Sequence, residues 1–206
     1  MNSIAPIFFL IPRLPNLNMK SVGGGELSNI LLINQIAKKY KVILIPMISS
    51  PNNYKFSQNV KIYKSNFNLT GRAGYFVQKY LLYYKRIHKL AIKYQPKKII
   101  ATRSTINSGY RIKLYFKSEF EIIVRAYEDF INIKNFDPFS KSSIFRKIEK
   151  FFFSKNILKI YKDVDRFITN SKYMSLAIEK DIGFRVKSLV IYPEIQLPRI
   201  KPKFES

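Results

Sequence analysis

The stretch from Ile7 to Pro46 contains, in order, an apolar run, a loop with three consecutive glycines, an amphipathic segment and a second apolar run. The two runs, residues 7–11 and 42–45, are apolar on both faces, which is typical of parallel strands that helices cover on either side. Between them, apolar residues recur at helical spacing from Leu27. This order predicts a strand–loop–helix–strand unit with a right-handed crossover.

The ends of these elements carry signals of their own. Glu26 stands in the first turn of the predicted helix, and lysines are expected to finish it, which is the charge distribution that a helix dipole favours. These lysines are Lys38, Lys39 and Lys41. We expect Pro12 to end the strand that precedes the loop.

Three glycines, Gly23, Gly24 and Gly25, stand directly before the helix. Glycine leaves backbone N–H groups open to a close ligand, and the helix dipole favours a phosphate or a carboxylate there. The alternative is a tight turn without a ligand. A dinucleotide fingerprint is excluded, because about ten residues separate the strand from Gly23, Ser28 replaces the third glycine, and residues 47–50 contain no acid.

The rest of the chain alternates between strands and helices. Further strands are predicted at residues 60–63, 97–102, 121–126, 165–169 and 188–192, and helices at 71–94, 105–116, 139–162 and 172–182. Asn170 and Ser171 are expected to cap the last helix and Gly183 to close it, while His88 is expected to have a packing or surface role. The pattern predicts an α/β, Rossmann-like, doubly wound and mostly parallel sheet of about seven strands with helices on both faces.

Polar residues that follow the predicted strands share one edge of the sheet, where open α/β sheets bind ligands. With the glycines and Glu26, the expected cleft is lined by Arg103, Ser104, Arg125, Tyr127, Glu128, Asp129, Asn170, Ser171 and Lys172. Acids are scarce in this chain, so we assign the candidate catalytic role to Tyr127, Glu128 and Asp129. The alternative for the two acids is a helix cap or a salt bridge to one of many lysines.

The charge balance restricts the partners. Net charge is +24, from 37 Lys and Arg against 13 Asp and Glu, and the cations are spread along the chain. Such a field attracts nucleic acid, anionic membranes and phosphorylated substrates alike. The aromatic and basic segments 71–94 and 139–162 suit an anionic bilayer, but they also suit helices that pack on the sheet with lysines in water. We do not expect nucleic-acid binding, because no helix-turn-helix, zinc or RNP-type signature is present.

Several features bear on location and organisation. The sequence has no cysteine, which excludes disulfides and thiolate metal sites. It shows no secretory signal and no run of about 18 apolar residues without charge. We therefore expect a cytoplasmic protein, with the inner membrane face as a peripheral location. Residues 1–192 are expected to form one domain, and the proline-rich residues 193–206 a linker.

Four segments give the chain a resemblance to the amino-terminal half of the two-domain GT-B glycosyltransferases, in particular the large retaining family four. The first is Gly24-Gly25-Glu26 before a helix, similar to the family's G-G-x-E start. The others are Pro96 to Ile100, Asp165 to Ser171, and Val190 to Pro193. Their order and spacing cover nearly the whole chain, from residue 7 to residue 194.

The resemblance implies a domain that holds a glycan or lipid-linked acceptor, with the glycine loop facing the diphosphate of a nucleotide-sugar donor. It also implies transfer with retention and without a metal or other cofactor. The donor-binding domain of such enzymes, with its E-x7-E motif, has no counterpart here, so we expect a partner chain or a longer polypeptide to supply it. Relatives commonly place a histidine where Tyr127, Glu128 and Asp129 stand. The alternative function is a non-catalytic module that binds membrane surfaces or polyanions.

Overall fold

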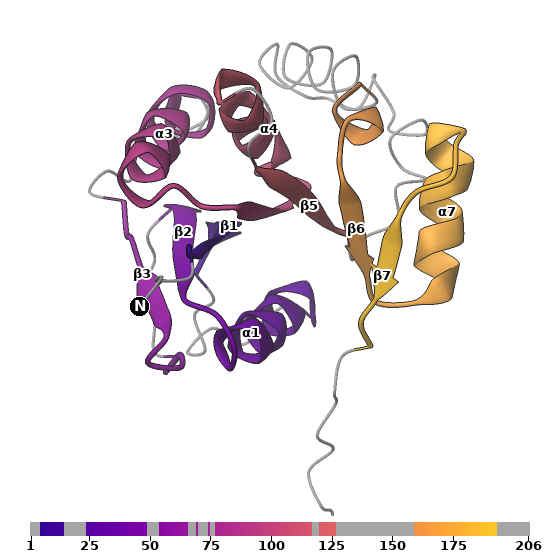
Figure 1. Ribbon diagram of the computed structural model, residues 1–206, viewed down its shortest axis with the longest axis horizontal. Helices are drawn as coiled ribbons and strands as arrows, with labels where there is room; N and C mark the ends of the chain where they lie inside the picture. Colours follow the sequence, from indigo (N-terminus) through magenta and orange to yellow (C-terminus); the bar gives the residue numbers. More distant parts are fainter. Residues whose placement is uncertain are drawn as a thin grey trace, which may run out of the picture.

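The computed structural model describes residues 5–14, 24–48, 54–65, 69, 74, 77–116, 120–126 and 159–192. Seven parallel strands form one sheet in the order β3-β2-β1-β4-β5-β6-β7 (Figure 1). The strands are β1 (Ile7–Arg13), β2 (Val42–Ile48), β3 (Val60–Ile62), β4 (Lys98–Thr102), β5 (Glu121–Ala126), β6 (Arg166–Thr169) and β7 (Ser188–Val190). This confirms the predicted Rossmann-like α/β fold and the position of every predicted strand.

Helices cover both faces of the sheet. They are α1 (Gly24–Ala37), the π-helix η1 (Gln78–Leu82), α3 (Tyr83–Tyr94), α4 (Ile106–Tyr115) and α7 (Lys172–Ile182). In Figure 1, α1 lies on one side of the sheet, and α3 and α4 lie on the other. Of the predicted helix 139–162, only the last turn, residues 159–162, falls within the described residues, and it is helical. No described helix combines the length and the apolar composition of a membrane span.

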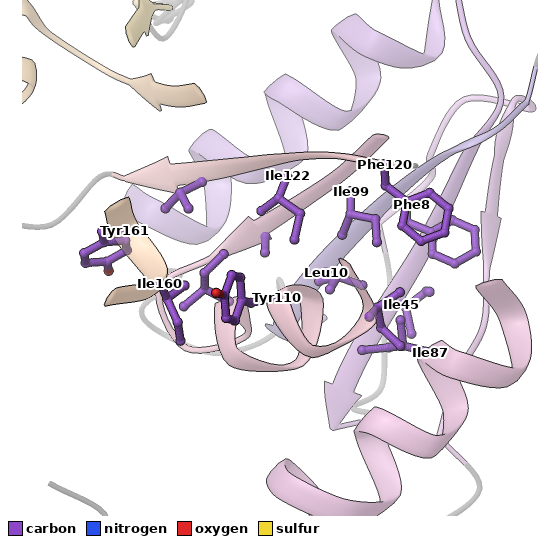
Figure 2. Packing of buried hydrophobic residues seen from close by; sticks show 14 of the residues in the cluster. Phe8, Leu10, Ile45, Ile87, Ile99, Tyr110, Phe120, Ile122, Ile160 and Tyr161 are labelled. Carbon is purple, nitrogen blue, oxygen red and sulfur yellow. The ribbon is translucent and has the colours of Figure 1, made fainter. Parts of the chain in front are cut away.

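Alternating side chains of the strands supply two cores. Phe8 and Leu10 of β1 pack toward α3 and α4 with residues such as Ile87, Ile99 and Tyr110 (Figure 2). Ile7, Phe9 and Ile11 of the same strand pack on the opposite face with Leu32 and Ile33 of α1. Both faces of β1 are buried from Ile7 to Ile11, and the strand is apolar over these residues, as a central parallel strand requires.

The prediction that Pro12 ends β1 was wrong, because the strand continues to Arg13. The Ile7 amide donates to the Lys41 carbonyl, so the backbone N–H and C=O groups of the odd residues of β1 point toward β2. The backbone nitrogen of Pro12 therefore points toward β4. Pairing with β4 already ends at Leu10, so no strand is present to accept from the missing N–H. Pro12 therefore stands where the pairing with β4 has ended, while the pairing of β1 with β2 continues to Arg13.

Two helices differ from the prediction at their ends. α1 begins at Gly24, so Gly24 and Gly25 belong to its first turn, and it ends at Ala37 instead of at the lysines. The segment expected to be one long helix contains the π turn η1 before α3. The predicted ends of α7 are confirmed. The Ser171 hydroxyl accepts from the Met174 amide at 3.1 Å, and Gly183 closes the helix with a φ of 77°.

Candidate functional site at the carboxyl edge of the sheet

The carboxyl ends of the seven strands lie along one edge, because all the strands are parallel. The chain moves outward from β1 to β2 and β3, then crosses back to β4, which lies on the other side of β1. The strand order therefore reverses between β1 and β4. In open α/β sheets this switch point is where connecting loops diverge and ligands bind.

The first turn of α1 stands at this switch point. Gly24 is exposed, and a Cβ atom added there would meet no atom of the described residues within 4 Å. The carboxylate of Glu26 is bound by Arg13 at the end of β1, with Nε and Oε1 2.6 Å apart. The open space beside Gly24 allows a ligand to reach the helix N-terminus, where unpaired N–H groups favour an anion. Gly23 lies outside the described residues.

Arg125, at the end of β5, is only 2% exposed. Its Nη2 donates to the Ser28 hydroxyl at 2.7 Å, and its Nη1 donates to the Ile168 carbonyl at 3.4 Å. The side chain thus connects β5 and β6 with the second turn of α1. It also contributes to a pocket of about 130 Å³ between α1 and Tyr192 beyond β7. The structure brings Arg125 to the glycine helix as expected, but with its cation buried instead of lining an open cleft.

A group of hydroxyls closes the turn after β4. Thr105 Oγ1 donates to the Leu10 carbonyl and accepts from the Thr102 amide, each at 3.0 Å, so it joins β4 to β1 at the switch point. The Ser104 hydroxyl lies 3.2 Å from that of Thr102. The sequence prediction included Arg103 and Ser104, both half-buried here, but missed Thr102 and Thr105. A threonine pair three residues apart at a strand end is the signal that indicates such a hydroxyl-to-backbone turn.

The loop after β6 has a mainly structural explanation. The Ser171 hydroxyl is occupied by the cap of α7, and Lys172 is exposed. Asn170 Oδ1 is buried and has no hydrogen-bond partner among the described residues. Tyr127, Glu128 and Asp129 lie outside the described residues, so their catalytic role stays a prediction. His88 packs edge-on against Tyr115 with ring centroids 4.3 Å apart, which fits the expected packing role.

No protein-family model matches the sequence, and no curated protein matches it. Solved glycosyltransferase structures share its fold at low identity. Sucrose-phosphate synthase from Thermosynechococcus elongatus has a TM-score of 0.64 at 14% identity, over 91% of this chain and 48% of that one. The UDP-glucosyltransferase from Polygonum tinctorium, which glucosylates indoxyl, has 0.62 at 10%, over 96% and 55%.

A third structure, Phytolacca americana UGT2 with UDP-2fluoro-glucose and pterostilbene, has a TM-score of 0.60 at 11% identity, over 96% of this chain and 56% of that one. The chain thus spans about half the length of the structures it matches. The narrower resemblance to the retaining family four is not confirmed. The seven-stranded parallel sheet is the Rossmann-like fold that GT-B glycosyltransferases have in about half of their chain.

Proposed function

We propose that this chain is the acceptor-binding half of a GT-B glycosyltransferase, which transfers a sugar from a nucleotide sugar to a glycan or lipid-linked acceptor. The observation that carries the proposal is the fold match over more than nine-tenths of this chain and about half of each enzyme. Residues 1–192 form the acceptor half, and residues 193–206 lead toward a donor-binding half in the same polypeptide or in a partner. Transfer proceeds with retention, as the sequence resemblance implies.

The first turn of α1 supports this role through its electrostatics. During transfer, the bond between the anomeric carbon and the donor diphosphate breaks, and the acceptor hydroxyl oxygen bonds to that carbon after losing its proton. Negative charge develops on the leaving diphosphate. The N–H groups around Gly24 and Gly25 and the positive end of the helix dipole stabilise that charge, while Arg13 holds Glu26 to one side.

The test replaces Gly24 in the complete enzyme, with the donor-binding half present. Because a Cβ atom at Gly24 meets no described atom within 4 Å, Gly24→Val should fold normally while it blocks the approach of the diphosphate. We expect the release of nucleoside diphosphate from a panel of nucleotide sugars to fall by about a hundredfold, as misplacement at a reacting centre does. Gly24→Ala is the matched control, and it should lose less.

Thermal unfolding of each variant separates the two kinds of damage. If a variant has the melting temperature of the unmodified protein but loses sugar transfer, the glycine turn belongs to the site. Full transfer by Gly24→Val would remove the turn from the site, and an unmodified enzyme that uses no nucleotide sugar would contradict the proposed function itself.

A second candidate function, binding to an anionic membrane, is favoured by the outer surface of α3 and α4. These helices meet along a seam in which the Arg111 guanidinium lies 4.0 Å from the ring centroid of Tyr84. Four large apolar side chains of η1, α3 and α4 are more than half exposed: Leu81, Ile92, Leu114 and Tyr115. Exposed lysines lie among them: Lys85, Lys89 and Lys93. Apolar and aromatic side chains surrounded by cations are typical of interfacial helices.

Vesicle sedimentation tests this surface directly. We expect the double change Leu114→Ser and Tyr115→Ser to weaken binding to phosphatidylglycerol vesicles. Tyr173→Ser with Leu176→Ser is the matched control, because these α7 side chains are equally exposed. Binding should also weaken in high salt, as the Debye length falls to about 3 Å at 1 M. Equal loss in both double variants would contradict a specific membrane face.

A further inference from the structure

A surface pocket of about 330 Å³ lies where η1 and α3 meet the end of β2 and the residues after β3. This volume falls within the range of about 300 to 1,000 Å³ that is typical of small-molecule sites. Met47 and Leu82 contribute apolar surface. The charged residues in the described lining are all cations: Lys64, Lys85, Arg86 and Lys89.

Side chains of the pocket wall donate hydrogen bonds to β2. β3 pairs with residues 42–44 of β2 only, so the last part of β2 has no described strand on that side. Side chains donate to three successive carbonyls of β2: Tyr83 to Ile45 at 2.7 Å, Arg86 to Pro46, and Gln78 to Met47 at 2.9 Å. Of the three, the Pro46 carbonyl faces the side where β3 has ended. The Tyr83 amide donates to the Gln78 carbonyl five residues back, which is the hydrogen bond of a π turn. The side chains of Gln78 and Tyr83, at the two ends of this turn, both donate to β2.

Arg86 has no described carboxylate partner in this wall, although its guanidinium lies 5.3 Å from the ring centroid of Tyr83. Its Nη2 donates to Pro46, but Nε and Nη1 are buried and have no hydrogen-bond partner among the described residues. Burial lowers the pKa of Arg86 below its usual value, because the charged form is desolvated. Buried cations in proteins are normally paired, since an unpaired one is costly. The wall therefore lacks a negative partner.

The surrounding chain does not supply that partner. No carboxylate of the described residues lines the pocket. Between Glu26 and Glu119 the sequence contains no Asp or Glu, and this interval includes every residue of β2, β3, η1, α3 and α4. Glu26 itself packs at α1, on the other face of the sheet, where Arg13 binds it. Among the described residues nothing supplies the counter-charge, so a bound anion is the partner that we consider.

We propose that this pocket binds a phosphate or diphosphate group carried by a larger molecule, with Arg86 as its central ligand and Lys64, Lys85 and Lys89 around it. Phosphate oxygens match the fork of guanidinium donors and also accept from lysine ammonium groups, so one dianion satisfies several cations at once. The apolar surface of Met47 and Leu82 suits the organic part of the ligand.

This site is separate from the glycine turn. Met47 and Tyr83 belong to the core on the α3 side of the sheet, whereas α1 packs on the core of the opposite face. Both sites lie toward the carboxyl edge, because β2 ends at Ile48 and α1 begins just after β1. One molecule anchored by its phosphate in the pocket can therefore extend along that edge, but binding itself does not depend on sugar transfer.

Titration of the full chain with inorganic pyrophosphate tests the proposal, by calorimetry at 150 mM salt so that diffuse binding to a basic protein is screened. We expect one saturable site, and about tenfold or greater loss of affinity in Arg86→Met. Arg166→Met is the control of equal charge change, because Arg166 is exposed and paired with Glu121 at 2.8 Å, and it should bind as the unmodified protein does.

Arg86 also holds Pro46, so a second variant keeps the test decisive if Arg86→Met fails to fold. Lys64→Met with Lys89→Met alters two exposed lysines that take no part in these hydrogen bonds to β2. This double variant should fold and lose pyrophosphate binding. If Arg86 is only structural, the double variant will bind pyrophosphate with unchanged affinity, and that result would overturn the proposal. The absence of a saturable site in the unmodified chain would overturn it as well.

Binding to vesicles of two lipids distinguishes a lipid phosphate from a soluble one. Phosphatidic acid presents a phosphomonoester, whereas phosphatidylglycerol presents a diester of lower charge. If binding to phosphatidic acid exceeds binding to phosphatidylglycerol and the excess disappears in Arg86→Met, the ligand is a lipid headgroup. If only pyrophosphate binding depends on Arg86, the ligand is a soluble phosphate ester. Equal behaviour of Arg86→Met and the unmodified chain in both arms overturns the site.

Discussion

Two regions of this molecule handle the excess of positive charge differently. At the amino ends of β4, β5 and β6, Glu121 binds both Lys98 and Arg166 at 2.8 Å, and Asp165 binds Lys113 at 2.6 Å. Around the pocket of η1 and α3, the cations have no described carboxylate near them. Described carboxylates are thus paired with cations at the amino ends of the strands, while the cations at the end of β2 have no described carboxylate partner.

The largest effect is expected at Arg125, the buried arginine that does have partners. Arg125→Ala removes the hydrogen bonds to Ser28 and Ile168 and leaves a void between β5 and α1. We expect it to lower the free energy of unfolding by about 3 kcal/mol, measured by urea denaturation. Arg86→Met loses one hydrogen bond to Pro46 but also releases a cation without a described carboxylate, so it should cost less, about 1 kcal/mol. Equal losses at the two arginines would remove the distinction between the regions.

The next effect concerns Asp165 in the paired region. Its carboxylate accepts from the Ile122 amide at 2.7 Å in addition to its ion pair with Lys113. Asp165→Ala leaves the amide of a fully buried strand residue without this partner, and we expect a loss of about 2 kcal/mol in the same urea assay. A loss near zero would mean that water replaces the carboxylate and that this pairing is not structural.

A smaller, pH-dependent effect is expected at Tyr110. Its hydroxyl donates to the Asp163 carboxylate, and this bond raises the pKa of Tyr110 to about 12. The folded state therefore holds the phenol proton more tightly than the unfolded chain does. The stabilisation is complete below about pH 10 and disappears as the pH rises through about 12. Tyr110→Phe should lower the free energy of unfolding by about 1 kcal/mol at pH 8, and the difference should shrink at pH 11.

The smallest effect uses two matched charge reversals. Lys89→Glu places an acid beside Arg86, and we expect it to raise the free energy of unfolding by about 0.5 kcal/mol. Lys98→Glu instead puts an acid next to Glu121 and should lower stability by a similar amount, about 0.5 kcal/mol. The two variants have the same net charge, so thermal melting at low salt compares them directly. Destabilisation by both would contradict the view that the pocket lacks an acid.

The sequence was sufficient for the strands, because the central ones are apolar runs buried on both faces and the edge strands β3 and β7 are short runs between polar loops. These signals are local. The sequence was less reliable at element ends. Pro46 lies inside β2 as Pro12 lies inside β1. The Val42 amide donates toward β3, and backbone groups of every second residue point the same way. The backbone nitrogen of Pro46 therefore points to the side where β3 has already ended. Which side of a strand has lost its partner depends on the lengths of its neighbours, and no local pattern contains that information.

The candidate site was predicted in its location but only partly in its members. The glycine turn, Arg103 and Arg125 do lie at the carboxyl edge, because the order of parallel strands dictates that edge. The assignment of Tyr127, Glu128 and Asp129 stays a prediction. The pocket of Arg86 was missed, since Arg86 is one of many cations in an aromatic segment and nothing local separates it from Lys85 or Lys89.

The sequence by itself determined the alternation of strands and helices, the caps of α7, and the excess of cations with its long acid-free interval, because these are properties of composition and near neighbours. Only the tertiary structure decided which cations are paired. Glu121 reaches Arg166, which lies far along the chain, through the pairing of β5 with β6, and Arg86 meets Pro46 because β3 is short. Pairing of charges depends on distances in space, and these are set by strand order and length.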